Sequence, residues 1–237
     1  MQHLDFAVTD LSRLGDRDLK FIIENFPEPG RSYEEVARVM HELPTTFESL
    51  LNSEFLYQKV CDKSVVLLDI SPFLLFNVLL RHTLSGHRTS NDRKIVNYIA
   101  NLLSIFVHAD RVHRIRPHDE ATYEYLVDMI QEARLSESRR QFLIYSHIGN
   151  YSLFISGLFP EWIEYRHRYK KRPINSKYYI DFGRTYYGLA AKHPMARQFH
   201  LDDVFLRLAM MFESYKATLN DIARNYLFAP KESLVQA

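Results

Sequence analysis

The most constraining feature of this sequence is a 20-residue stretch, residues 141–160, that contains no Asp, Glu, Lys or Arg. A helix of that length is long enough to cross a bilayer. The stretch also holds polar side chains that are unfavourable in lipid, namely Gln141, Ser146, His147, Asn150, Ser152 and Ser156. We therefore expect it to form the buried central helix of a water-soluble bundle, with no membrane insertion.

Glycine is scarce in the 237-residue chain, with 7 Gly against 15 Tyr and 16 Phe. Few glycines mean few tight hairpin turns, which favours helices joined by short connections. We predict an all-α fold, a multi-helix bundle or orthogonal array of roughly eight to ten helices. One alternative stays open, because residues 55–60 and 65–70 fit either a small β-hairpin near residues 55–70 or a helix followed by a loop.

Capping residues mark where several helices begin. Ser71 followed by Pro72 is typical of a helix start, and Asn175 or Ser176 can cap a Tyr-rich helix that ends near His193 and Pro194. We predict helices at about residues 16–25, 32–43, 46–52, 73–84, 90–108, 122–135, 136–159, 160–171, 176–193 and 202–228.

The chain length suggests a main core with a small appended unit. We expect an N-terminal helical unit at residues 1–62, a main helical core at residues 63–230 and a frayed tail at residues 231–237. Residues 32–60 resemble the two core helices of a helix-turn-helix. The second of these helices carries Glu48 and Glu54 but no Lys or Arg, whereas DNA recognition relies on basic and amide side chains. Protein contact is favoured, and a DNA-binding regulator remains an alternative.

Four segments carry a family resemblance: LLDISPFLLFNVLLR from Leu67, RKIVNYIANLLSIFV from Arg93, RRQFLIYSHIGNYSLFISGLFPEWIE from Arg139 and YYIDFGRTYYGLAA from Tyr178. Together they are similar to an uncharacterised family of bacterial, all-helical, cytoplasmic proteins. The resemblance implies a bacterial cytoplasmic origin and no assigned activity, so it transfers no functional residue. The single cysteine, Cys61, also fits a reducing compartment.

Two helices carry small residues at helical spacing. Gly149, Ser152 and Ser156 share one side of the uncharged helix, and the Tyr-rich helix contains Gly183, Ala190 and Ala191. Small side chains let helix backbones approach closely, so we expect these two helices to pack against each other.

The candidate ligand-binding residues lie on the same two helices. His147 and Asn150 are three apart on one, and Asp181 and Arg184 are three apart on the other, close to Tyr186. A buried imidazole or charge must be hydrogen-bonded or paired. These five residues therefore form either a polar network that ties the helices together or a small-molecule pocket in which Arg184 holds an anionic group.

Enzymatic signatures stay at the level expected by chance. Three Arg–His pairs have the spacing used by some metal-independent ribonucleases: Arg81–His87, Arg111–His118 and Arg140–His147. With 20 Arg and 11 His in the chain, roughly three such pairs are expected by accident. A HEPN-like ribonuclease using the His147/Arg184 region is kept as an alternative.

We therefore expect a non-enzymatic binding or regulatory module that acts through contacts with a partner protein or as a homo-oligomer. Trp162 and Tyr165 are aromatic residues in a charged helix and are candidates for such contacts. Nucleic acid is a weaker candidate: the net charge is only +1, although residues 166–172 are basic with interleaved aromatics. We predict no cofactor. We also predict no metal, since a di-iron helical bundle needs two Glu-x-x-His pairs and Glu164 and His167 form the single such pair.

Overall fold

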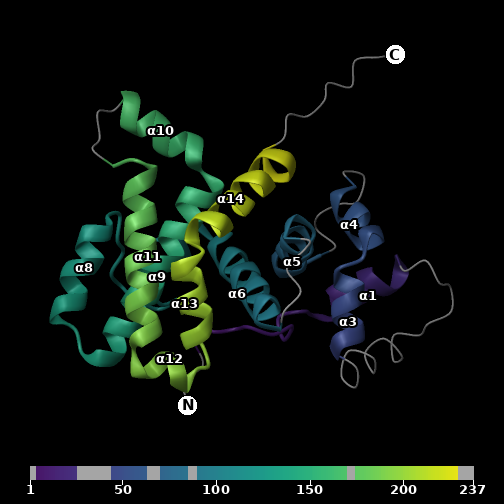
Figure 1. Ribbon diagram of the computed structural model, residues 1–237, viewed down its shortest axis with the longest axis horizontal. Coiled ribbons are helices and arrows are strands. Elements are labelled where there is room, and N and C mark those ends of the chain that lie inside the picture. Colours follow the sequence, from purple (N-terminus) through teal and green to yellow (C-terminus); the bar gives the residue numbers. More distant parts are fainter. Residues whose placement is uncertain (1–3, 26–43, 63–69, 85–89, 170–173, 229–237) are drawn as a thin grey trace.

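The computed structural model describes residues 4–25, 44–62, 70–84, 90–169 and 174–228 (Figure 1). In these residues the fold is all-α and contains no strand, which confirms the predicted fold class. The helices are α1 (Asp16–Glu24), α3 (Pro44–Leu51), α4 (Glu54–Cys61), α5 (Pro72–Thr83), α6 (Ser90–Phe106), α7 (Ala109–Val112), α8 (Leu126–Leu135), α9 (Ser138–Leu158), α10 (Pro160–Tyr169), α11 (Ser176–Lys192), α12 (Pro194–Gln198), α13 (Asp202–Met210) and α14 (Phe212–Ile222), the last continuing as a π-helical turn, Ala223–Leu227.

The β-hairpin alternative is wrong for its first half, because residues 55–60 lie inside α4. Ser53 caps this helix: its Oγ accepts a hydrogen bond from the backbone N of Leu56 at 3.2 Å. Leu56 and Val60 are both buried while Gln58, midway between them, is exposed. In a strand all three would share one face, so this pattern is that of a helix. Residues 63–69, the second half, lie outside the described residues, as does the predicted helix at residues 32–43.

Local capping determines other helix starts as predicted. The Oγ of Ser71 accepts from the backbone N of Leu74 at 3.1 Å, and the Oδ1 of Asn175 accepts from the backbone N of Tyr178 at 3.1 Å. The last predicted helix differs, because it breaks at Met211 into α13 and α14. This break, together with α4 and the short helices α7 and α12, brings the count in the described residues to 13 α-helices.

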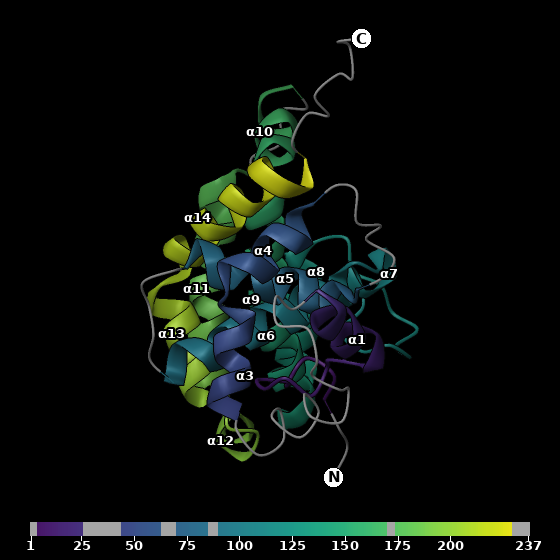
Figure 2. The ribbon, with the colours of Figure 1, turned by 90° about the vertical axis from the view of Figure 1, so that its right-hand side faces the viewer.

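Helix α9 is the centre of the fold (Figures 1 and 2). It packs against α8, α11 and α14, and α11 in turn packs against α13. All side chains from residue 146 to residue 158 are buried, so the uncharged stretch is the spine that the sequence predicts. Among the described helices, α9 included, none has the length and hydropathy required to cross a bilayer.

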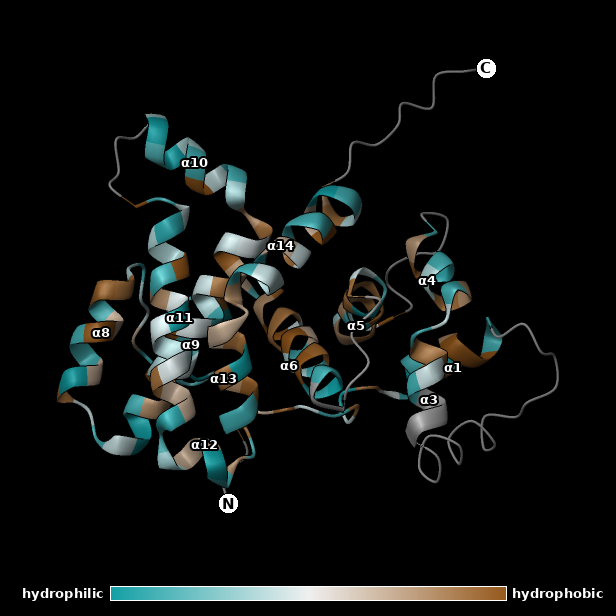
Figure 3. Cartoon of the chain, in the orientation of Figure 1, coloured by the Kyte–Doolittle hydropathy of each residue, from teal (hydrophilic) through white to brown (hydrophobic). Residues whose placement is uncertain are grey.

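The apolar side chains form two clusters that share α5, one of the more hydrophobic helices in Figure 3. Phe73 and Phe76 belong to the main core, whereas Leu74 and Val78 belong to a smaller cluster with residues of α1, α3 and α4. Phe6, near the N-terminus, joins the main core. Each cluster therefore contains residues from both sides of position 62. A domain boundary at that position stays a prediction.

Two glycines bring α9 and α11 into close contact, as the small residues predict. A Cβ on Gly149 would lie 2.6 Å from Cδ1 of Tyr187. A Cβ on Gly183 would lie 3.1 Å from Cβ of Ser152 and would overlap the ring of Phe212. Since Phe212 is 1% exposed, its ring has little room to move away.

Replacing Gly183 with Ala is therefore expected to reduce the free energy of unfolding by about 1–2 kcal/mol. Overpacking a buried site destabilises by up to about 3 kcal/mol, and the higher helix propensity of Ala relative to Gly stabilises by about 1 kcal/mol. Gly188 is the matched control on the same helix, because no atom lies within 4 Å of its Cβ position. Gly188→Ala should stabilise by about 1 kcal/mol. Urea denaturation of both variants checks the prediction, and equal stability of the two would contradict it.

Candidate functional site

His147 and Asn150 are buried and hydrogen-bonded to neighbouring helices. The Nε2–H of His147 donates to the backbone carbonyl of Val112 in α7 at 3.1 Å. The Oδ1 of Asn150 accepts from the hydroxyls of Tyr98 in α6 and Tyr187 in α11, at 2.8 and 2.9 Å. These contacts make both residues part of a polar network that ties the core together.

The other three predicted ligand-binding residues lie elsewhere. Asp181 and Arg184 are exposed on α11, and the Nη1 of Arg184 is 3.5 Å from Oε1 of Glu213. Tyr186 is half-buried against Tyr145, with 5.6 Å between the ring centroids. The face of α11 that is buried carries Tyr179, Gly183, Tyr187 and Ala190. Two of the five predicted residues are thus buried, two are exposed and one is half-buried, and their role as a ligand-binding site stays a prediction.

The arginines of the three predicted Arg–His pairs form ion pairs with carboxylates. Their partners are Glu48 for Arg81, Asp5 for Arg111, and Asp119 and Glu132 for Arg140. His147 contacts a backbone carbonyl, as described above, and His87 lies outside the described residues. Within the described part of the chain, no three His, Cys, Asp or Glu side chains come close enough to hold a metal ion.

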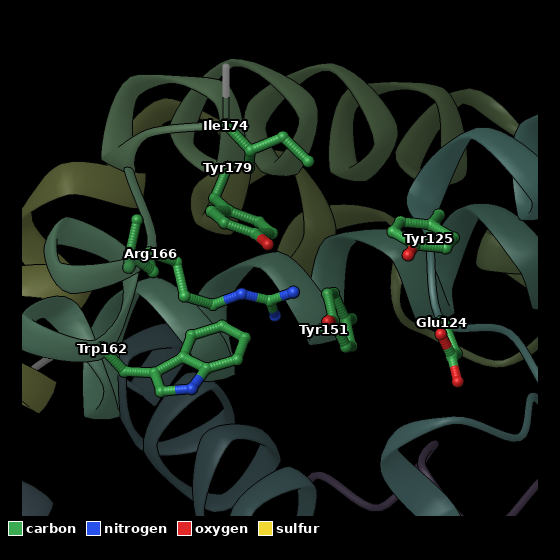
Figure 4. Close-up of a pocket in the computed structure, with 8 residues that line it drawn as sticks. Glu124, Tyr125, Tyr151, Trp162, Arg166, Ile174 and Tyr179 are labelled. Carbon is green, nitrogen blue, oxygen red and sulfur yellow. The ribbon is translucent and has the colours of Figure 1, made fainter. Parts of the chain in front are cut away.

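A different hollow lies between the segment at residues 110–125, the second half of α9, and α10. It is a cleft of about 540 Å³, and a narrower hollow continues from it toward the start of α11. Five residues line both parts: Glu124, Tyr125, Tyr151, Trp162 and Arg166. We call the two parts together the aromatic cleft, and these five residues are labelled in Figure 4.

Arg166 and Trp162 are one helical turn apart on α10 and contact each other. The guanidinium carbon of Arg166 lies 4.4 Å from the centroid of the Trp162 ring, which is a cation–π contact. Figure 4 shows the Arg166 side chain reaching across the indole toward Tyr151, with Tyr179 on its other side. Trp162 is 42% exposed and Tyr125 is 41% exposed, so two aromatic faces of the cleft remain open to solvent.

Two tyrosines form the deeper wall of the cleft. Tyr151 and Tyr179 are buried, with 6.2 Å between their ring centroids. Burial, helped by the neighbouring Tyr179, raises the pKa of Tyr151. A protonated phenol offers both a donor and an acceptor, so Tyr151 can hydrogen-bond a ligand without adding charge.

The loop that forms the opposite wall is pinned at both of its ends. The Nδ1–H of His113 donates to the carbonyl of Tyr123 at 3.0 Å, and the backbone N of Tyr123 donates to the carbonyl of His113 at 2.9 Å. Between them, Asp119 accepts from the Nη1 of Arg140 in α9 at 2.5 Å. A loop fixed in this way presents its side chains in a preorganised arrangement, which reduces the entropy lost on binding.

The sequence identified only part of this cleft. Trp162 and the basic run that starts at Arg166 stand out in the sequence, but no local pattern links Tyr125 and Tyr151 to them, because these residues lie on different structural elements. The helix-turn-helix alternative stays a prediction, since residues 26–43 lie outside the described residues. The chain matches no protein-family model, no curated protein and no solved structure. The resemblance to a bacterial family likewise stays a prediction.

Proposed function

We propose that this protein is a non-enzymatic binding module that acts through protein–protein contacts, and that the aromatic cleft receives a segment of the partner. One observation carries the proposal: Trp162, Tyr125 and Arg166 meet at an open hollow of about 540 Å³. Trp, Tyr and Arg are the residue types that dominate binding energy at protein interfaces. The pinned loop and the buried tyrosines supply the rigid support that such contacts require.

A selection from a displayed library of random peptides tests this proposal. Peptides enriched on the wild-type protein are measured by calorimetry against Trp162→Ala, which removes the largest open aromatic face. We expect about thirtyfold weaker binding, the effect of losing a residue worth about 2 kcal/mol at an interface. Trp162 is partly exposed, so the exchange should leave the helical circular dichroism unchanged.

Tyr169→Ala is the matched control, because Tyr169 is an exposed aromatic on the same helix that does not line the cleft. This variant should bind the selected peptides within about twofold of wild type. The proposal is contradicted if no selected peptide depends on Trp162, or if both variants lose affinity equally. Light scattering decides whether a second copy of the chain is the partner instead.

A further inference from the structure

We propose that the aromatic cleft recognises an acidic side chain of the partner segment, with Arg166 as its receptor. The inference rests on the proposed function, because it names the chemistry of the group that enters the same cleft. It follows from the pairing of the arginines, from the charges around the cleft and from the aromatic walls.

Arg166 makes no ion pair with any carboxylate of the described residues. Its neighbour on α10, Glu164, is engaged by Arg168 at 3.7 Å. Arg166 instead makes the cation–π contact with the Trp162 ring. A cation–π contact uses none of the guanidinium N–H donors as a hydrogen bond to a carboxylate, and these donors can bind an incoming carboxylate through two parallel hydrogen bonds. Arg166 is therefore held in place with its donors available.

A second arginine lines the wider part of the same cleft. The Nε of Arg114 is buried and finds no acceptor among the described residues. Buried donors in proteins are almost always paired, so an unpaired guanidinium N–H beside a cleft indicates a group that a bound partner would satisfy. Two arginines without a described carboxylate partner thus face one hollow.

The acidic residues of the cleft occupy its rim. Asp110 and Glu124 line it but are exposed, whereas Arg114 and Arg166 are half-buried. Charge that is partly withdrawn from water interacts more strongly with an incoming ion than hydrated charge does. The half-buried positive groups therefore favour an acidic group inside the cleft, and the rim carboxylates favour a neutral or basic flank.

The aromatic surfaces specify what accompanies the acidic group. The open face of Trp162 adjoins the Arg166 guanidinium, and the open face of Tyr125 lies across the hollow, beyond Tyr151 (Figure 4). Both faces suit an apolar or aromatic side chain. A free phosphate or acetate would leave these faces uncovered. The occupant that fits both features is an extended segment with Asp or Glu next to a large apolar residue.

The single tryptophan of the chain makes the test specific. In a nitrogen-15 correlation spectrum, the one indole N–H peak belongs to Trp162 and reports directly on the cleft. The probes are two dipeptides, acetyl-Phe-Asp-amide and its uncharged counterpart acetyl-Phe-Asn-amide. We expect the Asp peptide to shift this peak saturably and to bind about tenfold more tightly than the Asn peptide, the usual advantage of a charge-assisted hydrogen bond.

Arg166→Gln should abolish the preference for Asp. Arg168→Gln is the matched control, with the same charge change two residues away on the exposed side of the helix, and should retain it. Equal binding of both peptides to the wild type would overturn the inference, as would an equal loss in both variants, which indicates a general charge effect. Inorganic phosphate that shifts the peak as tightly as the Asp peptide would overturn the assignment to a peptide.

Failure of this inference and failure of the proposed function give different results. Displayed peptides that depend on Trp162 but carry no acidic residue would reject the acidic group and retain the binding module. A preference for Asp in the dipeptide titration, without any displayed peptide that depends on Trp162, would retain the anion receptor and reject the module.

Discussion

Replacing Glu48 with Met is expected to reduce the free energy of unfolding by about 3–5 kcal/mol. Glu48 in α3 forms an ion pair with the Nη1 of Arg81 in α5, and both residues are buried. Burial lowers the pKa of Arg81, and Glu48 opposes that shift. Without this carboxylate the guanidinium would be a charge inside the protein with no ionic partner. Urea denaturation measures the loss.

Arg81 cannot escape to water easily in that variant, because its other donors are held. The Nε of Arg81 donates to Oδ1 of Asn77, and its Nη2 donates to Oδ1 of Asn97 at 3.0 Å. Asn97 in turn donates to the carbonyl of Thr9 at 3.2 Å. The ion pair therefore belongs to a network that joins α3, α5, α6 and the N-terminal segment, and it helps connect the two apolar clusters.

Two further variants separate this explanation from a loss of packing alone. Adding Arg81→Met to Glu48→Met removes the unpaired charge and should restore at least half of the lost stability, since apolar replacements of buried ion pairs are often neutral. Glu24→Gln breaks the exposed Lys20–Glu24 pair and should cost less than about 0.5 kcal/mol. A double variant no more stable than Glu48→Met would contradict the prediction.

The fold was predictable where the signal is local. The run of residues without charge predicts the buried central helix α9. Ser71 and Asn175 predict helix starts, because a capping side chain acts within three residues of its own position. The break at Met211 has no such signal: residues 209–213 contain neither Pro, Gly nor a capping residue. Phe212, the first residue after it, packs at the Gly183 surface of α11, so the break reflects tertiary packing.

The orientation of α11 illustrates a second limit of sequence reasoning. The Tyr-rich helix α11 carries apolar side chains on every side, so polarity alone did not show which face points inward. The small residue Gly183 marks that face, and Asp181 lies two positions away, about 160° around the helix. The aromatic cleft is not predictable from the sequence for a different reason. Its residues Tyr125, Tyr151 and Trp162 lie on three separate structural elements.

Acidification is expected to destabilise this protein by about 3 kcal/mol between pH 7 and pH 4 through His147 alone. Burial lowers the pKa of His147 to about 4; the carbonyl of Val112 opposes the shift, and Arg111 adds to it. The unfolded chain binds this proton with the ordinary pKa of 6.5. As the pH falls below 6.5, the unfolded state takes up a proton that the folded state does not, so stability falls until the pH reaches about 4.

The variant His147→Gln isolates this contribution, because Gln can still donate to the carbonyl of Val112 but does not titrate. Urea denaturation at a series of pH values from 7 to 4 gives the slope of the unfolding free energy with pH. In the variant this slope should be smaller, by the equivalent of up to one proton taken up on unfolding. The acidic residues titrate in both proteins and cancel in the comparison. If wild type and His147→Gln lose stability in parallel, the unfolding of this core in acid does not depend on His147.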